Sequence, residues 1–195
     1  MIIFVTGGAR GGKSDFAQDL VEKLSGKRLF LATAQALDDE MRQRIEKHRE
    51  QRGNRWDTLE EPVHLGRVLR SAAGSYDAVL VDCFTVWMSN LLLEYNPPIP
   101  PLLKGGQRGI LPFNKGGMGG FSDGKISEIV DDFFSSIDEF KGTIVIVSNE
   151  VGMGIVPENK LARKYRDQLG FLNQRIARRA DEVYALISGI PIKIK

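Results

Sequence analysis

The chain has 195 residues, of which 42% are hydrophobic and 27% charged, and its formal net charge at pH 7 is +2. This balance is typical of a folded globular protein, and the length suits a single domain with one sizeable core. The small net charge gives no overall basic field that would favour nucleic acid as a partner. No segment reaches the roughly 18 uninterrupted apolar residues that a membrane span needs.

Apolar runs alternate with helical periodicities along the chain. In chain order we predict a strand at 2–5, a helix at 13–24, a strand at 28–32, helices at 38–52 and 63–73, strands at 78–81 and 143–147, a helix at 159–181, a strand at 182–187 and a short antiparallel edge at 192–195. Continuous apolar strands that alternate with helices predict an α/β fold, with a mostly parallel sheet and helices on both faces.

Residues 96–124 interrupt this alternation. They are rich in proline and glycine, and residues 104–110 are roughly repeated at 115–121. Such a composition has little to bury against the entropic cost of ordering. We expect a mobile surface insertion between two helices, carrying no chemistry, within a single domain over residues 1–195.

The strongest motif is a phosphate-binding loop, G-x-x-x-x-G-K-[ST], between the first predicted strand and helix. Its glycines let backbone N–H groups point at phosphate oxygens, and the helix start adds a positive dipole end. Lys13 is expected to reach the β- and γ-phosphates of GTP or ATP, and the Ser14 hydroxyl to bind Mg²⁺. The nucleotide-binding residues predicted here are Gly7, Gly8, Ala9, Arg10, Gly11, Gly12, Lys13 and Ser14.

Asp82 follows the predicted strand at 78–81. Phosphate-loop enzymes need a carboxylate at the end of a nearby strand to hold the metal, and Asp82 is the best candidate. A cap for the following helix is the alternative. Cys83 is the only cysteine, which excludes an internal disulfide and suits a reducing compartment, so we expect a cytoplasmic protein. A small buried apolar role suits this residue better than a reactive thiol.

The chain has two histidines. His64 follows Glu61 and Pro62 and is expected at the surface or in a cap. His48 lies on a predicted helix rich in charged residues. Neutral imidazole can attack phosphorus, but the residues alone do not separate a nucleophile from a solvated side chain.

The combined pattern resembles a known family. It includes residues 6–14, 32–35, 37–41, His48 and Arg52, and the run Asn-Glu-Val-Gly-Met-Gly-Ile-Val-Pro at 149–157. Together these motifs resemble the bifunctional adenosylcobinamide kinase / adenosylcobinamide-phosphate guanylyltransferase of cobalamin biosynthesis. The resemblance covers nearly the whole chain apart from the insertion, and the run at 149–157 is more specific than the phosphate loop.

The resemblance implies a RecA-like P-loop NTPase fold and two reactions. The family phosphorylates the aminopropanol hydroxyl of adenosylcobinamide with ATP or GTP, and then transfers GMP from GTP to that phosphate through a GMP–histidine adduct. By motif position the adduct would form on His48, with Lys13 as the second catalytic residue. The resemblance also implies a homo-oligomer, with a trimer expected. The further nucleotide contacts that it implies are Ala32, Thr33, Ala34, Arg49, Glu50, Gln51, Arg52, Glu60 and Asp82.

Three features depart from the family pattern. Gln51, Arg52 and Gly53 replace a usual Arg-Pro, some relatives carry glutamate where Asp82 stands, and the insertion is longer than the usual connection. The main alternative function is a small-molecule kinase without a covalent step. A nucleic-acid-dependent ATPase is a third reading, but the insertion has few charges for that role.

Overall fold

The computed structural model describes residues 1–35, 53–95 and 124–195. The predicted helix at 38–52, with His48, and residues 96–123 of the predicted insertion lie outside these ranges. Within them, no helix is both long enough and apolar enough to cross a lipid bilayer.

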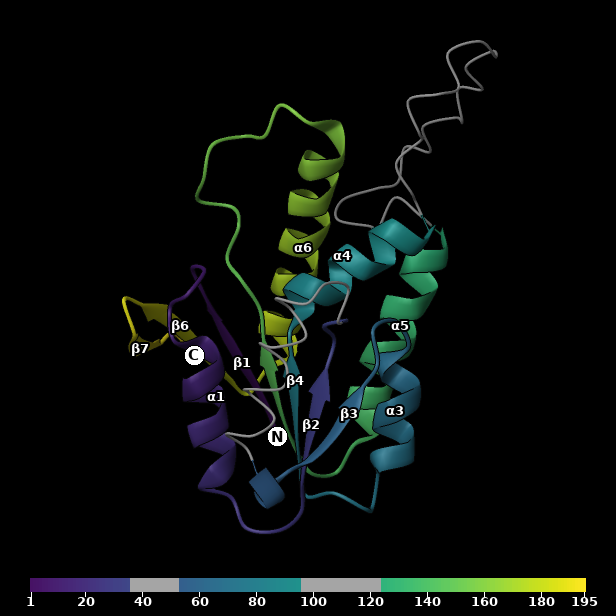
Figure 1. The fold of residues 1–195 in the computed structure, drawn as a ribbon, viewed down its shortest axis with the longest axis vertical. Coiled ribbons are helices and arrows are strands. Elements are labelled where there is room, and N and C mark those ends of the chain that lie inside the picture. Colours follow the sequence, from purple (N-terminus) through teal and green to yellow (C-terminus); the bar gives the residue numbers. More distant parts are fainter. Residues whose placement is uncertain (36–52, 96–123) are drawn as a thin grey trace.

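Seven strands form one sheet in the order β3-β2-β4-β5-β1-β6-β7 (Figure 1). Every neighbouring pair is parallel except β6 and β7, which are antiparallel. The predicted mostly parallel sheet is therefore confirmed, and so is the antiparallel edge. The strands are β1 (Ile2–Gly7), β2 (Arg28–Ala32), β3 (Asp57–Glu60), β4 (Ala78–Asp82), β5 (Thr143–Val147), β6 (Glu182–Ile187) and β7 (Ile190–Lys193).

Helices cover both faces of the sheet, as predicted (Figure 1). The helix α1 packs on one face, and α3, α4, α5 and α6 pack on the other. The helices are α1 (Lys13–Glu22), α3 (Leu65–Ala72), α4 (Phe84–Tyr95), α5 (Gly124–Glu139) and α6 (Lys160–Arg179), and a 3₁₀ turn, η1, spans Gly53–Arg55.

The α3–α6 face holds the larger apolar core. Its centre is aromatic: the ring centroids of Phe84 and Phe133 are 5.3 Å apart, and those of Trp87 and Phe133 are 5.1 Å apart. All three side chains are fully buried. Such contacts add to the hydrophobic stabilisation from burial alone.

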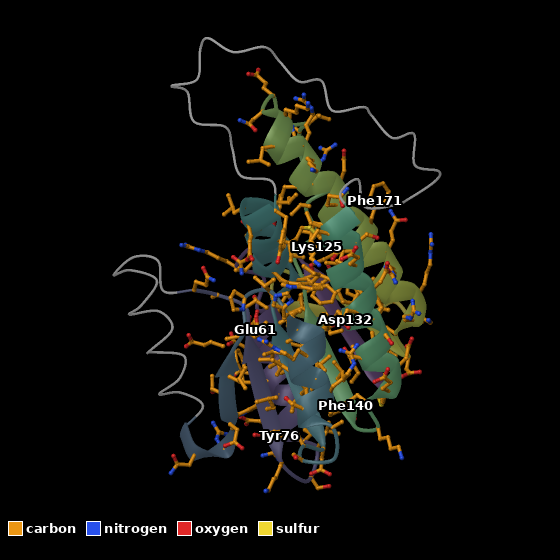
Figure 2. The ribbon with its side chains drawn as sticks, turned by 90° about the vertical axis from the view of Figure 1, so that its right-hand side faces the viewer. Glu61, Tyr76, Lys125, Asp132, Phe140 and Phe171 are labelled. Atoms are coloured by element: carbon orange, nitrogen blue, oxygen red, sulfur yellow. The ribbon has the colours of Figure 1, made fainter. Side chains whose placement is uncertain are left out.

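Several predicted boundaries are wrong by one or two residues. The helix predicted at 63–73 begins at Leu65, because the Glu61 carboxylate accepts hydrogen bonds from the N–H groups of Val63 and His64. Figure 2 shows Glu61 at this end of α3. The helix predicted at 159–181 begins at Lys160, after Asn159 as its N-cap, and ends at Arg179. The helix predicted at 13–24 ends at Glu22, and the antiparallel edge predicted at 192–195 lies at Ile190–Lys193.

Candidate functional site

The predicted site residues that the structure describes all lie at one edge of the sheet. In parallel sheets the carboxyl ends of the strands meet at the same edge, where ligands bind. Here β1 leads into the phosphate loop, β2 into Thr33 and Ala34, and β3 and β4 end at Glu60 and Asp82. Residues His48, Arg49, Glu50, Gln51 and Arg52 lie outside the described ranges.

The backbone of the phosphate loop explains its glycines. A Cβ on Gly7 would lie 2.5 Å from the backbone oxygen of Leu186 on β6, so no larger residue fits there. Gly12 has a φ of +79° and precedes the first residue of α1. The N–H of Gly11 donates to the backbone oxygen of Gly8 at 3.2 Å, which closes the turn. The loop thus takes the tight path that the motif predicts, directly before a helix N-terminus.

Lys13 is the buried cation of the loop. Its side chain is 7% exposed, and its Nζ donates to the backbone oxygen of Gly8 at 2.6 Å. Burial lowers the pKa of Lys13, while the nearby Cys83 and Asp82 raise it. Asp82 therefore lies within electrostatic reach of Lys13, across β5, which separates β4 from β1 in the sheet. A positive charge held here suits a bound phosphate.

Thr33 fixes the end of β4. It is fully buried, and its Oγ1 both accepts from the N–H of Cys83 and donates to the Cys83 backbone oxygen, at 2.9 Å each. Its N–H donates to the backbone oxygen of Asp82 at 3.1 Å. These hydrogen bonds hold the backbone at Asp82 and Cys83, so Thr33 supports the position of Asp82. The resemblance assigned Thr33 to nucleotide binding, and its hydrogen bonds to Cys83 give a structural reason for a threonine at this position.

The two residues predicted to bind metal carry the oxygen ligands that Mg²⁺ prefers. Asp82 ends β4 and Ser14 lies in the first turn of α1, so a carboxylate and a hydroxyl are present at the same edge. Mg²⁺ prefers oxygen ligands and commonly takes only one or two from the protein, with substrate phosphates and water completing its shell. No described group of three or more His, Cys, Asp or Glu residues could hold a metal ion. Ser14 and Asp82, together with nucleotide phosphates and water, would make a set of this kind.

Cys83 is half-buried against the core on the α1 face. Burial raises the pKa of its thiol to about 11, with a smaller contribution from the Asp82 carboxylate. The thiol is therefore protonated at neutral pH, which agrees with the predicted packing role.

Residues 148–150, which we call the β5 extension, lie beside the phosphate loop. The N–H of Ser148 donates to the Val5 backbone oxygen and that of Glu150 to the Gly7 backbone oxygen, each at 3.0 Å. Between them, Asn149 is held on both sides. Its N–H donates to Thr85 Oγ1 at 2.8 Å, and its backbone oxygen accepts from Asn173 Nδ2 at 2.9 Å.

Sequence reasoning missed the roles of Thr85 and Asn173. Asn173 is buried and bonded to the β5 extension. These partners are 64 and 24 residues away from Asn149 along the chain. No local pattern could have paired them, although the specific run at 149–157 marked the segment itself.

Glu60 lies far from the phosphate loop in the sheet. It is exposed and ends β3, four strand positions from β1, or about 19 Å at the usual spacing between strands. That separation suits contact with the base or ribose end of a nucleotide whose phosphates lie at β1. The adjacent Glu61 serves the start of α3 instead.

The strand, glycine loop and helix, with a buried lysine near a strand-end carboxylate, define a P-loop nucleotide-binding protein. A solved ATPase from the type III secretion system of pathogenic bacteria shares the fold, with a TM-score of 0.52 and 10% identity over 95% of this chain and 51% of that chain. The chain therefore spans about half of that structure, and this likeness shows the fold alone.

The family is shown by sequence. The model of the cobinamide kinase / cobinamide phosphate guanyltransferase family matches residues 3–194, and the chain belongs to this family. It is 39% identical over 195 residues to the bifunctional adenosylcobalamin biosynthesis protein CobU of Escherichia coli K12, covering 100% of both. It is 40% identical over 195 residues, again 100% of both, to the protein of the same name from Salmonella typhimurium LT2. The suspected resemblance is confirmed.

Proposed function

We propose that the chain catalyses two successive transfers in cobalamin biosynthesis. It phosphorylates the hydroxyl of adenosylcobinamide with ATP or GTP. It then transfers GMP from GTP to adenosylcobinamide phosphate, which gives adenosylcobinamide-GDP and pyrophosphate. The observation that carries this proposal is full-length similarity to bifunctional relatives together with a phosphate loop of the required geometry.

The phosphate loop would bind the nucleotide phosphates in both transfers. Backbone N–H groups over residues 8–14 and the N-terminus of α1 offer donors and positive potential, and Lys13 adds a localised charge. Ser14 and Asp82 would hold Mg²⁺, which neutralises charge on the transferring group. Arg10 is exposed on the loop and has a φ of +57°, so its guanidinium is available to the outer phosphates.

The second transfer would use His48 as a nucleophile. Its imidazole would attack the α-phosphorus of GTP, pyrophosphate would leave, and the substrate phosphate would displace the histidine from GMP. Residues 49–52 and Glu60 would contact the guanine nucleotide, with Ala32, Thr33 and Ala34 lining the end of β2. We further propose a cytoplasmic homo-oligomer, with a trimer expected from the family.

The covalent step has a direct test. The protein is incubated with α-³²P-GTP and Mg²⁺, denatured, and examined for an acid-labile, alkali-stable label, with His48→Ala in parallel. Label on the wild type and none on the variant would support the phosphoramidate adduct. If the wild type binds GTP and acquires no label, the covalent step fails and a small-molecule kinase without an intermediate becomes the better account.

A further inference from the structure

The two proposed transfers make different demands on an acceptor. The first acceptor is a hydroxyl, which must lose its proton as it attacks phosphorus. The second is a phosphate, whose oxygens are already ionised at neutral pH. A carboxylate that removes a proton would therefore serve the first transfer and not the second.

Three described carboxylates at this edge are either far from the phosphate loop or already serve another role. Glu60 is about 19 Å from β1 by strand spacing, and Glu61 accepts hydrogen bonds at the start of α3. Asp82 lies near Lys13 and is the metal candidate. Glu150, in the β5 extension, lies beside the phosphate loop, and the two transfers described above give it no task.

The structure holds Glu150 beside the phosphate loop. The strand order places β5 between β1 and β4, so the residues that follow β5 lie between the phosphate loop and Asp82. The N–H of Glu150 donates to the Gly7 backbone oxygen at 3.0 Å. The preceding residue, Asn149, is fixed through Thr85 and Asn173.

The Glu150 carboxylate is also oriented. Its Oε1 accepts from the N–H of Gly152 at 2.6 Å, and a Cβ on Gly152 would lie 2.9 Å from that oxygen. The glycine therefore permits the close approach. Glu150 is half-buried, and among the described residues its carboxylate accepts a hydrogen bond through Oε1 alone. One oxygen thus positions the carboxylate and the other is available to an acceptor hydroxyl.

We propose that Glu150 is the general base of the phosphoryl transfer. The acceptor oxygen attacks the γ-phosphorus, the bond from that phosphorus to the β–γ bridging oxygen breaks, and the nucleoside diphosphate leaves. The hydroxyl proton passes to Glu150 Oε2. This inference rests on the proposed function, because it needs a hydroxyl acceptor in the first transfer and a phosphate acceptor in the second.

Glu150→Gln tests the assignment, because it keeps the oxygen that accepts from Gly152 and removes the base. ADP formation from ATP and adenosylcobinamide is measured separately from pyrophosphate release from GTP and adenosylcobinamide phosphate. We expect kcat for ADP formation to fall about 100-fold or more, with the KM for ATP and the guanylyl transfer close to wild type. Glu158→Gln, an exposed acid in the same connection, is the matched control and should leave both rates unchanged.

Three results would overturn the assignment. They are equal losses of both transfers, no loss of phosphoryl transfer, and an equal loss in Glu158→Gln. Glu150→Asp gives a second check that does not depend on the glutamine variant alone. It keeps a carboxylate and should retain more phosphoryl transfer than Glu150→Gln, and the reverse order would contradict a general base. If the wild type itself lacks phosphoryl transfer, the proposed function fails and the inference fails with it.

Discussion

The carboxyl edge of the sheet and the α3–α5 helical face are built in different ways. At the edge, backbone turns and polar side chains hold Lys13, Asp82 and Glu150 with hydrogen bonds. On the helical face, large aromatic side chains such as Phe133 fill a dry core. The difference indicates that chemistry and stability depend largely on separate residues, so substitutions should separate them.

Phe133→Ala should have the largest effect on stability. The side chain is fully buried among Phe84, Trp87 and Phe134, so truncation leaves a cavity. We expect the free energy of unfolding to fall by about 3–5 kcal/mol, measured by urea denaturation. The kcat of the folded fraction should stay within a few-fold of wild type. A large loss of kcat at full folding would show that the helical face contributes to the chemistry.

Lys13→Ala should lower activity and leave stability close to that of the wild type. It removes the charge that the phosphate loop holds near Gly8, and we expect both transfers to fall about 10²–10³-fold or more. Stability should be unchanged or slightly higher, since a partly desolvated cation is removed. Initial rates and the melting temperature check this, with the exposed Lys23→Ala as a matched control. A variant that melts far below wild type would contradict the separation.

Asn173→Ala should lower both stability and activity moderately. The change removes the amide that donates to the Asn149 backbone oxygen and leaves that oxygen without its partner. We expect a loss of about 1–3 kcal/mol in the free energy of unfolding, together with a lower kcat because the β5 extension is less well fixed. Gln174→Ala, at the exposed next position, is the control for both measurements. Full stability with wild-type kcat would show that the hydrogen bond does not hold the extension.

Glu61→Gln should have the smallest effect, and that effect depends on pH. Burial raises the pKa of Glu61, but hydrogen bonds from the N–H groups of His64 and Val63, together with Arg67, outweigh it, so the pKa is lowered from 4.5. The folded pKa thus lies below the unfolded one, so the carboxylate stabilises the fold fully above pH 4.5 and loses this effect as the pH falls through the lowered value.

At neutral pH, Glu61→Gln should therefore cost about 0.3–1 kcal/mol, because the amide oxygen can still accept from both N–H groups and only the negative charge at the helix N-terminus is lost. Urea denaturation at pH 7 and at successively lower pH values measures the difference from wild type. The difference should shrink as the pH falls below 4.5. A difference that stays constant across this range would show that the carboxylate charge does not stabilise α3. Asp132 of α5, labelled in Figure 2, accepts from the exposed Arg70 Nη2 of α3 through its Oδ1, and this ion pair offers a comparison that does not involve a helix N-terminus.

The sequence allowed prediction of the elements whose signal is local. The continuous apolar runs of β1, β2, β4, β5 and β6 are confirmed, and so is the helix that follows the phosphate loop. The strand β3 was missed because Asp57–Glu60 is polar and mostly exposed at the sheet edge. The bounds of α4 were not predicted, because Val86 and Leu93 put further apolar residues beside the buried face of Phe84, Trp87, Met88, Leu91 and Leu92 and so weaken its helical period.

The candidate site was predictable only in part. The motif predicts the roles of Lys13 and Ser14 directly, because the phosphate loop is one contiguous segment, and these roles stay predictions. The support for Asp82 by Thr33, and for Asn149 by Thr85 and Asn173, joins strands and helices that are distant in the chain. Those contacts depend on strand order, which the sequence pattern does not specify. The assignments of His48 and residues 49–52 stay predictions.

The central claim is that one site carries out both transfers. Mass spectrometry of the corrinoid tests it most directly, after incubation of the protein with adenosylcobinamide, ATP, GTP and Mg²⁺. We predict adenosylcobinamide-GDP as the product, with adenosylcobinamide phosphate appearing first and neither formed by Lys13→Ala. An unchanged corrinoid with the wild-type protein, or a Lys13→Ala variant that forms both products at wild-type rates, would contradict the account.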